Sequence, residues 1–259
     1  MSAGTNLTRN IHSVDRTGDF LLNVGMGLYS DLGSVEKFGR NPDVDTGSED
    51  LWNAGGTWVG PTTARIHDIV STSIADDVGS TGAETIRIFG LDANYAFQQE
   101  DISMDGQTNV PTVNTYTMIH RMLVLTAGSG ATNAGAITAT AQTDATVTCQ
   151  IGIGVAQTQL GVYQIPAGYT GHVIRYGGST DGTGGVQVDI ALVAKPFGGV
   201  YNLKHNFTLR AGGSSNYAIN IPFGIHLTEK TIVKLRATVD GANNDVSGSF
   251  SLLLRNLNP

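Results

Sequence analysis

Apolar and polar residues alternate along much of the chain with a period of two, which places successive side chains on opposite faces of a β-strand. In residues 186–192 every second residue is valine, isoleucine or leucine. Residues 233–239 and 250–254 repeat the pattern, and it assigns Lys234 to the face opposite the apolar residues. Such runs predict half-buried antiparallel strands. Further strands are predicted at 63–73, 84–90, 96–104, 115–127, 136–141, 146–155, 161–165, 172–176, 206–210 and 217–223.

Aspartate–glycine pairs stand between predicted strands at Asp105, Asp181 and Asp240. Glycine adopts positive φ freely and aspartate tolerates it, so these pairs predict tight hairpin turns. The best candidate for an amphipathic helix, residues 20–29, is interrupted by two glycines. We therefore expect little or no α-helix.

Short strands joined by glycine-rich turns predict an all-β protein, because each sheet can bury its apolar face only against another sheet. We expect an antiparallel β-sandwich or jelly-roll-like fold with two β domains. The polar stretches 127–135 and 142–145 place the first domain at residues 62–142 and the second at residues 146–259. Residues 1–61 hold few alternating runs and are predicted to form an extended N-terminal arm.

The composition narrows the classes of partner. Hydrophobic residues are 40% of the chain, charged residues are 14%, and the formal net charge is −7. A negative chain without a cluster of lysine and arginine disfavours nucleic acid. No stretch approaches the roughly 18 apolar residues of a membrane-spanning helix, and the N-terminus lacks the pattern of a secretion signal. We expect a protein that folds in a reducing cytoplasm and binds neither nucleic acid nor membrane.

Few residues suggest chemistry. The single cysteine, Cys149, lies in an alternating run and is predicted to be a buried apolar side chain. The six histidines are scattered, and His120, within a predicted strand, is expected to be satisfied by hydrogen bonds. The glycine motifs of esterases, nucleoside triphosphatases and dinucleotide-binding enzymes are missing from the sequence. No cofactor and no metal site are predicted.

The segment 41–58 is the most distinctive of the chain, because it combines acidic residues with both tryptophans. Asp43 and Asp45 are spaced as in a calcium loop, but the sixth and twelfth positions of such a loop are Ser48 and Ala54 instead of glycine and glutamate. The favoured interpretation is a solvated turn in which the two aspartates cap backbone amides.

Four acidic residues could in principle provide the carboxylate pair of a glycosidase. Each lies at a predicted strand edge or turn, where a solvent-facing acid is the usual finding, so no catalytic residue is assigned and no enzyme is expected. These residues are Glu84, Glu100, Asp101 and Glu229.

Large aromatic side chains bury much area in cores and in protein interfaces. Trp52 and Trp58 could therefore anchor the arm on the first β domain or contact another subunit, and both interpretations stay open. A candidate interface is assigned to Phe20, Leu22, Asp43, Asp45, Trp52 and Trp58.

Five segments carry a resemblance to known proteins: GRNPDVDTGSEDLWNAGG (39–56), ETIRIFGLDANY (84–95), LTAGSGATNAGAIT (125–138), VYQIPAGYTG (162–171) and EKTIVKLRATVDGANNDVSGSFSLLL (229–254). Together and in this order they resemble a family of virion structural proteins of tailed bacteriophages, common among phages of aquatic bacteria. The resemblance covers most of the chain from about Gly39 onward. No catalytic residue is carried over from it.

The resemblance implies a non-enzymatic virion component that is present in many copies and assembled in the bacterial host cytoplasm. Within that class we expect a capsid decoration, cement or head-fibre protein that stabilises the outer shell as a homo-oligomer, with a trimer favoured. Its partner would be the major capsid protein or another virion protein. The alternative is a tail or adsorption-apparatus component that recognises a host surface glycan, and a polysaccharide-cleaving enzyme is a third hypothesis.

Overall fold

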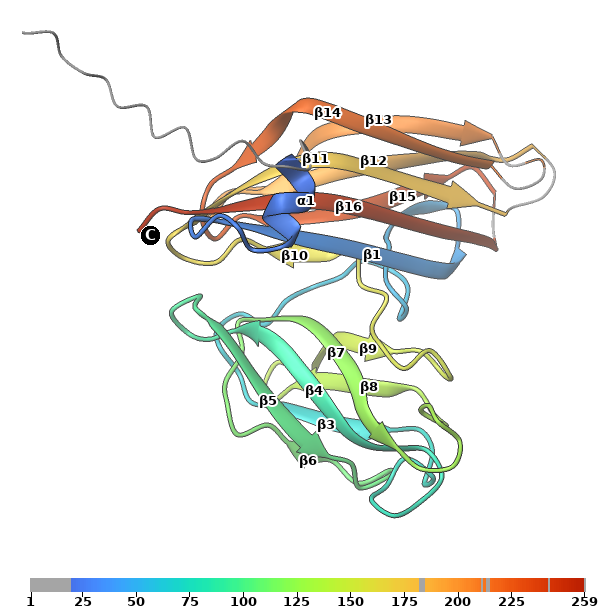
Figure 1. Cartoon of the computed structure of the whole chain (residues 1–259). Coiled ribbons are helices and arrows are strands. Elements are labelled where there is room, and N and C mark those ends of the chain that lie inside the picture. Colours follow the sequence, from blue (N-terminus) through green and yellow to red (C-terminus); the bar gives the residue numbers. More distant parts are fainter. Residues whose placement is uncertain (1–19, 182–184, 211, 213–214, 242, 259) are drawn as a thin grey trace, which may run out of the picture.

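The computed structural model describes residues 20–181, 185–210, 212, 215–241 and 243–258 (Figure 1). Within these ranges the chain forms strands β1 to β16 and the short helix α1 (Phe20–Gly25). The pairings that join β1 and β3 to β16 into sheets are all antiparallel. The predicted all-β class is confirmed. None of the described helical residues form a helix of the length and apolarity needed to span a bilayer.

The larger of two sandwiches has two four-stranded sheets. One sheet contains, in order, β1 (Leu32–Val44), β16 (Asn244–Asn256), β11 (Tyr169–Thr180) and β14 (Ser215–Leu227), and the other contains β10 (Val162–Gln164), β15 (Ile232–Val239), β12 (Gln187–Lys195) and β13 (Asn202–Arg210). Counted along the chain as strands one to eight, the sheets have the orders 1-8-3-6 and 2-7-4-5. Every connection except that from β12 to β13 crosses between the sheets, so this sandwich is jelly-roll-like.

The smaller sandwich is inserted between the first two strands of the larger one (Figure 1). Its sheets have the orders β6-β3-β8-β9 and β5-β4-β7. The bounds are β3 (His67–Ser71), β4 (Ala83–Leu91), β5 (Phe97–Ser103), β6 (Val110–Pro111), β7 (Met118–Ala127), β8 (Ile137–Ala141) and β9 (Thr146–Ile151). The short β2 (Gly47–Asp50) precedes it, and the next residue, Leu51, donates its N–H to Leu235 O of β15 at 3.0 Å.

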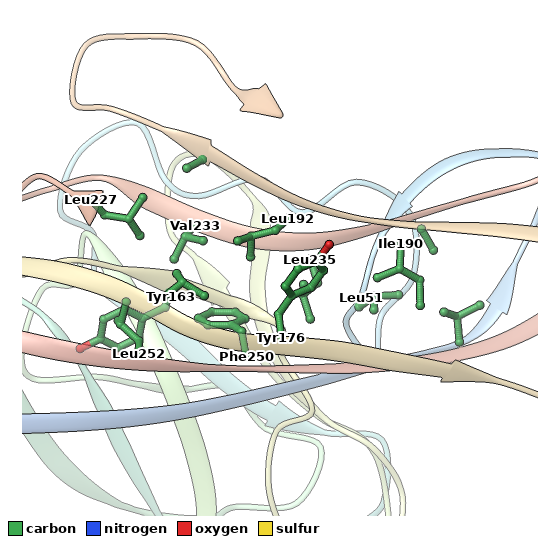
Figure 2. Packing of buried hydrophobic residues seen from close by; sticks show 14 of the residues in the cluster. Leu51, Tyr163, Tyr176, Ile190, Leu192, Leu227, Val233, Leu235, Phe250 and Leu252 are labelled. Carbon is green, nitrogen blue, oxygen red and sulfur yellow. The ribbon is translucent and has the colours of Figure 1, made fainter. Parts of the chain in front are cut away.

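Each sandwich has its own hydrophobic core. Figure 2 shows the larger core, where Tyr176, Leu235 and Phe250 pack between the sheets. The predicted alternation in residues 186–192 is confirmed, because Val188, Ile190 and Leu192 of β12 are fully buried. Cys149 lies in the core of the smaller sandwich, as predicted, and is a free thiol.

The predicted N-terminal arm is wrong for residues 32–50. Residues 32–44 form β1, which pairs with β16 along its length and is part of the larger sandwich. Alternation misses this strand because three of its four buried positions hold Lys37, Gly39 and Asn41, and Val44 alone is apolar. Gly39 is required there, since a Cβ at this position would lie 2.1 Å from Leu51 O. Residues 1–19 lie outside the described residues.

The predicted domain boundary is also corrected. β9, assigned to the second domain, pairs with β8, so the smaller sandwich extends to residue 151. The larger sandwich is discontinuous in sequence, because β1 precedes the smaller sandwich and β10 follows it.

Two predicted turns do not close hairpins. Asp240 and Gly241 lead from β15 to β16, which lie in opposite sheets, and Asp105 and Gly106 lead from β5 to β6, which pairs with β3. Gly182, after Asp181, is outside the described residues. An aspartate–glycine pair thus fixes a change of direction but not the partner of the strand that follows.

Candidate functional site

The two sandwiches meet along a seam whose two ends differ. At one end, called here the closed end, Asp50 contacts Lys234 and Arg236 of β15. Lys234 Nζ lies 2.5 Å from Asp50 Oδ2, neither side chain is exposed, and Arg236 Nε donates to Asp50 Oδ1 at 3.0 Å. The N–H of Trp58 donates to the same carboxylate at 2.8 Å, and Lys234 Nζ lies 4.3 Å from the centroid of the Tyr201 ring. At the closed end the buried lysine is thus matched by a buried carboxylate.

The sequence pattern placed Lys234 on the exposed face of its strand, and this is wrong. Its side chain is fully buried because Asp50 supplies the opposite charge. Burial lowers the pKa of Lys234, while the charge of Asp50 and its hydrogen bond raise it. A period of two shows which residues share a face but not whether another domain covers that face.

At the other end, called the open end, Lys37 of β1 meets His120 of β7. Lys37 Nζ donates to the carbonyl oxygen of His120 at 2.5 Å, and no carboxylate accompanies it in the described structure. The His120 ring stacks on Tyr163 with centroids 4.1 Å apart, and its Nε2 accepts the N–H of Gln164 at 3.3 Å. The prediction that hydrogen bonds satisfy His120 is confirmed.

Burial shifts the ionisable groups of the open end toward their neutral forms. It lowers the pKa of Lys37 to about 7, where nearby Arg121 acts in the same direction and Cys149 opposes it. Burial also lowers the pKa of His120 well below its ordinary value and raises the pKa of Tyr163. Lys37, His120 and Tyr163 are therefore biased toward their uncharged, hydrogen-bonding forms.

A cavity of about 730 Å³ opens beside these groups, between the start of β1 and strands β5 and β7. A row of four rings lines it, with the outer two from the larger sandwich and the inner two from the smaller one: Tyr169 lies 5.8 Å from Phe97, Phe97 lies 6.3 Å from His120, and His120 stacks on Tyr163. Phe97 is 53% exposed. Tyr163 lies at one edge of the larger core (Figure 2), and its buried hydroxyl has no hydrogen-bond partner among the described residues.

A second surface lies on the outside of the sheet β1-β16-β11-β14, where α1 crosses it (Figure 1). Phe20 and Leu22 of α1 are about half exposed, and a groove of about 630 Å³ beside α1 is lined by Ile174, Pro222 and neighbouring residues. We call α1, this groove and the adjoining part of β14 the outer face.

β14 is an edge strand that bulges at the outer face. Ile174 of β11 is opposed by the four residues from Ile221 to Gly224, and Gly224 has a φ of 65°. The bulge carries Phe223, which is 97% exposed. The bulge and Pro222 prevent another strand from pairing along this whole edge, because a bulge twists the edge and proline lacks a donor. Contact here would use the Phe223 side chain instead of added strand hydrogen bonds.

Both tryptophans of the candidate interface are buried within this chain. Trp52 and Trp58 belong to the core of the smaller sandwich, and Trp58 Nε1 donates to Thr148 O at 2.9 Å. Their assignment to an intersubunit surface is corrected, and the alternative of anchors within the chain holds. The segment that carries them connects the two sandwiches, and indole rings fix it in place.

The acid-rich segment does not form one site. Asp43 and Asp45 are exposed, Asp50 is buried at the closed end, and Glu49 accepts the N–H groups of Asp45 and Gly56 at 3.2 and 2.7 Å. The backbone amides are thus capped by Glu49, not by the two aspartates as predicted. The described residues include no group of histidine, cysteine, aspartate and glutamate side chains placed to hold a metal ion.

The four glycosidase candidates have separate structural partners. Glu84 and Glu100 accept backbone N–H groups of Gly79 and Val113. Asp101 pairs with Arg87, and Glu229 accepts the N–H of Gly168. Each carboxylate holds a local turn or strand pair.

Sequence reasoning missed the residues that define both surfaces. Lys37, Phe97 and Tyr163 come together only through the docking of the sandwiches, so no local pattern could reveal them. Phe223 left one signal, an apolar IPFG run in a segment without charged residues.

No protein-family model matches this chain, and no curated protein matches it. Among solved structures, it is similar to a structure of the Gx strain of infectious bursal disease virus at 11% identity and a TM-score of 0.23, over 86% of this chain and 72% of that chain. It is also similar to a VP2 subviral particle of infectious bursal disease virus at 12% identity and a TM-score of 0.23, over 88% of this chain and 73% of that chain. This weak likeness to viral particle proteins carries no argument about function.

Proposed function

We propose that this chain is a non-enzymatic structural protein of a tailed-bacteriophage virion. In this proposal it is a capsid decoration, cement or head-fibre protein that stabilises the outer shell as a homo-oligomer. The segments that resemble phage virion proteins support it, and so does the jelly-roll-like sandwich, an architecture that viral capsid and lectin domains share. Because one fold serves many functions, evidence for this function has to come from specific residues on the surface.

The observation that carries the proposal is Phe223 on the outer face. Phe223 is 97% exposed and follows Pro222, which lines the same groove as Phe20 and Leu21, and exposed apolar residues that gather on one face mark interaction sites. The whole of β14, SNYAINIPFGIHL, contains no aspartate, glutamate, lysine or arginine. Copies with a net charge of −7 repel one another, and a neutral apolar strand is where they could approach most closely. Phe20 and Leu22 extend the same face and stay in the proposed interface.

In the proposed mechanism, the contact area buried between subunits provides the stabilisation. Apolar contacts on the outer face would join the subunits, and the assembled oligomer would hold neighbouring capsid proteins together from outside without touching the DNA. Such contacts need no preorganised chemistry, only a large and well-packed buried surface.

Replacement of Phe223 by alanine tests the interface. We expect the variant to fold normally and to lose at least about tenfold in self-association, because a central aromatic residue supplies much of the energy of an interface. Light scattering over a range of protein concentrations would measure this. Val113→Ala is the matched control, since Val113 is 88% exposed on the smaller sandwich. Equal behaviour of the two variants would remove Phe223 from the interface.

The location on the virion needs a separate experiment. Purified protein added to particles that lack it should coat the shell in many copies when these are imaged. Binding confined to the tail, in few copies, would favour the second candidate function, a tail or adsorption-apparatus component that recognises a host surface glycan. The aromatic cavity at the open end is the observation that favours this second candidate.

A further inference from the structure

We infer that the cavity at the open end of the seam is a binding site for a neutral saccharide, held against the aromatic row by Phe97 and Tyr169. The inference rests on the second candidate function and gives it a site and a ligand class. Ser34, Val35 and Glu36 line both this cavity and the groove of the outer face, whereas Phe223 and α1 do not line the cavity.

The shape of the cavity suits a small ligand. Its volume of about 730 Å³ lies within the roughly 300–1,000 Å³ of small-molecule sites. Both sandwiches contribute to its walls, and sites are common where two domains meet.

The aromatic row provides a platform. Phe97 from the smaller sandwich and Tyr169 from the larger one lie 5.8 Å apart at an interplanar angle of 75°. Phe97 remains 53% exposed, although its neighbours in the row are more deeply placed. The C–H face of a pyranose ring is apolar and packs on such a ring, while its hydroxyl groups point outward to polar partners.

Polar partners surround the platform. Tyr163 lines the cavity, and its buried hydroxyl has no partner within the described residues, so its donor and acceptor capacity is unused. Asp31, Glu36 and Asn256 line the same cavity and can accept or donate hydrogen bonds to sugar hydroxyls.

The charges select against an ionised ligand. Two acidic residues, Asp31 and Glu36, and two basic residues, Lys37 and Arg121, line the cavity. Lys37 Nζ is already bound to His120 O, and Arg121 Nη2 lies 3.4 Å from Glu36 O. Because the two signs are present in equal number, the lining gives neither an anionic nor a cationic sugar a net attraction. Recognition would therefore rest on stacking and on hydrogen bonds, which a neutral saccharide can supply.

The test is titration of the full chain with cellobiose and with maltose, followed by protein NMR or calorimetry. We expect saturable binding of at least one of these neutral disaccharides, and about tenfold weaker binding in Phe97→Ala because the stacking surface is lost. Tyr163→Phe should weaken binding while leaving the fold intact. Phe223→Ala is the control and should bind like the natural chain.

Three results would overturn the inference: no saturable binding of either disaccharide, equal loss in Phe97→Ala and Phe223→Ala, or tighter binding of glucuronate than of both neutral sugars. These failures are distinguishable from failure of the structural proposal. Self-association that depends on Phe223 would survive an empty cavity, and sugar binding that depends on Phe97 would survive a monomeric chain.

Discussion

The two ends of the seam each bury a lysine, and they solve the problem of its charge differently. At the closed end Lys234 faces Asp50, and the pair is completed by Arg236 and by a backbone N–H. At the open end Lys37 faces a carbonyl oxygen, and it is buried to 5% exposure without an acid. The charge of Lys234 is compensated by Asp50, whereas burial lowers the pKa of Lys37 so that its amine can become neutral.

This difference suggests that the closed end fastens the two sandwiches together, whereas the open end can bind a ligand. The Asp50–Lys234 pair is wholly buried, so it offers nothing to another molecule, and at the closed end it helps to fasten the two sandwiches. The open end keeps a cavity, a half-exposed ring and an unpartnered phenol, at a cost in stability. Variants at the two ends should therefore respond in opposite ways.

The largest effect is expected from Asp50→Asn. Loss of the carboxylate leaves the Lys234 charge buried and uncompensated, which should lower the free energy of unfolding by about 3–5 kcal/mol. Urea unfolding followed by circular dichroism measures it. The control is Arg236→Gln, which removes the partly exposed partner of the same carboxylate and should cost about 1 kcal/mol or less. Equal losses would mean that Lys234 does not depend on Asp50.

The next effect depends on pH and concerns Lys37→Met. The pKa of Lys37 is about 7 in the fold and lies near 10.4 in an unfolded chain. Between these values the unfolded chain binds the extra proton, so the stability of the natural protein rises with pH, by up to about 5 kcal/mol. Below pH 7 both states are protonated and the full cost is present.

Lys37→Met should therefore be more stable than the natural protein at pH 6.5, with a gap that narrows toward pH 9.5. Its lost hydrogen bond to His120 O offsets about 1 kcal/mol of the gain. Urea unfolding at the two pH values measures the gap, and the exposed Lys204→Met is the control. If the difference in free energy of unfolding between Lys37→Met and the natural protein does not change with pH, the amine of Lys37 does not become neutral on burial.

The smallest effect distinguishes two buried tyrosines of the larger core. Tyr176 bonds through its hydroxyl to His205 Nδ1 at 2.6 Å, whereas the Tyr163 hydroxyl is unpartnered among the described residues. Tyr176→Phe should cost about 1 kcal/mol, and Tyr163→Phe should be neutral or stabilising by up to about 1 kcal/mol. Thermal unfolding of the two variants side by side measures this. Equal losses would show that the Tyr163 hydroxyl is satisfied in solution.

The sequence predicts the strands better than it predicts their partners. Alternation locates β12, β15 and β16 because one face of each is packed in an apolar core. It fails for β1, whose buried residues are mostly polar or small, and for Lys234, whose cover comes from a residue far away in the chain. Burial against another domain leaves no period in the sequence.

The candidate functional surfaces were harder to predict from the sequence than the strands were. Phe20 and Leu22 are exposed as an interface would require, and their role stays a prediction. Trp52 and Trp58 could not be divided between core and interface, since both demand the same large apolar side chain. The aromatic row at the open end joins residues of four strands, and only the docking of two sandwiches brings them together.

The pairing of β1 with β16 has a consequence for synthesis on the ribosome. The first described strand of the chain pairs with the last one, so the jelly-roll-like sandwich cannot close until β16 has been synthesised. The smaller sandwich is built from one continuous segment and can fold while β16 is still unmade. During that interval β1 lacks its partner strand, and its backbone N–H and C=O groups are unpaired. The folded smaller sandwich is then the nearest structured part of the chain that β1 could contact.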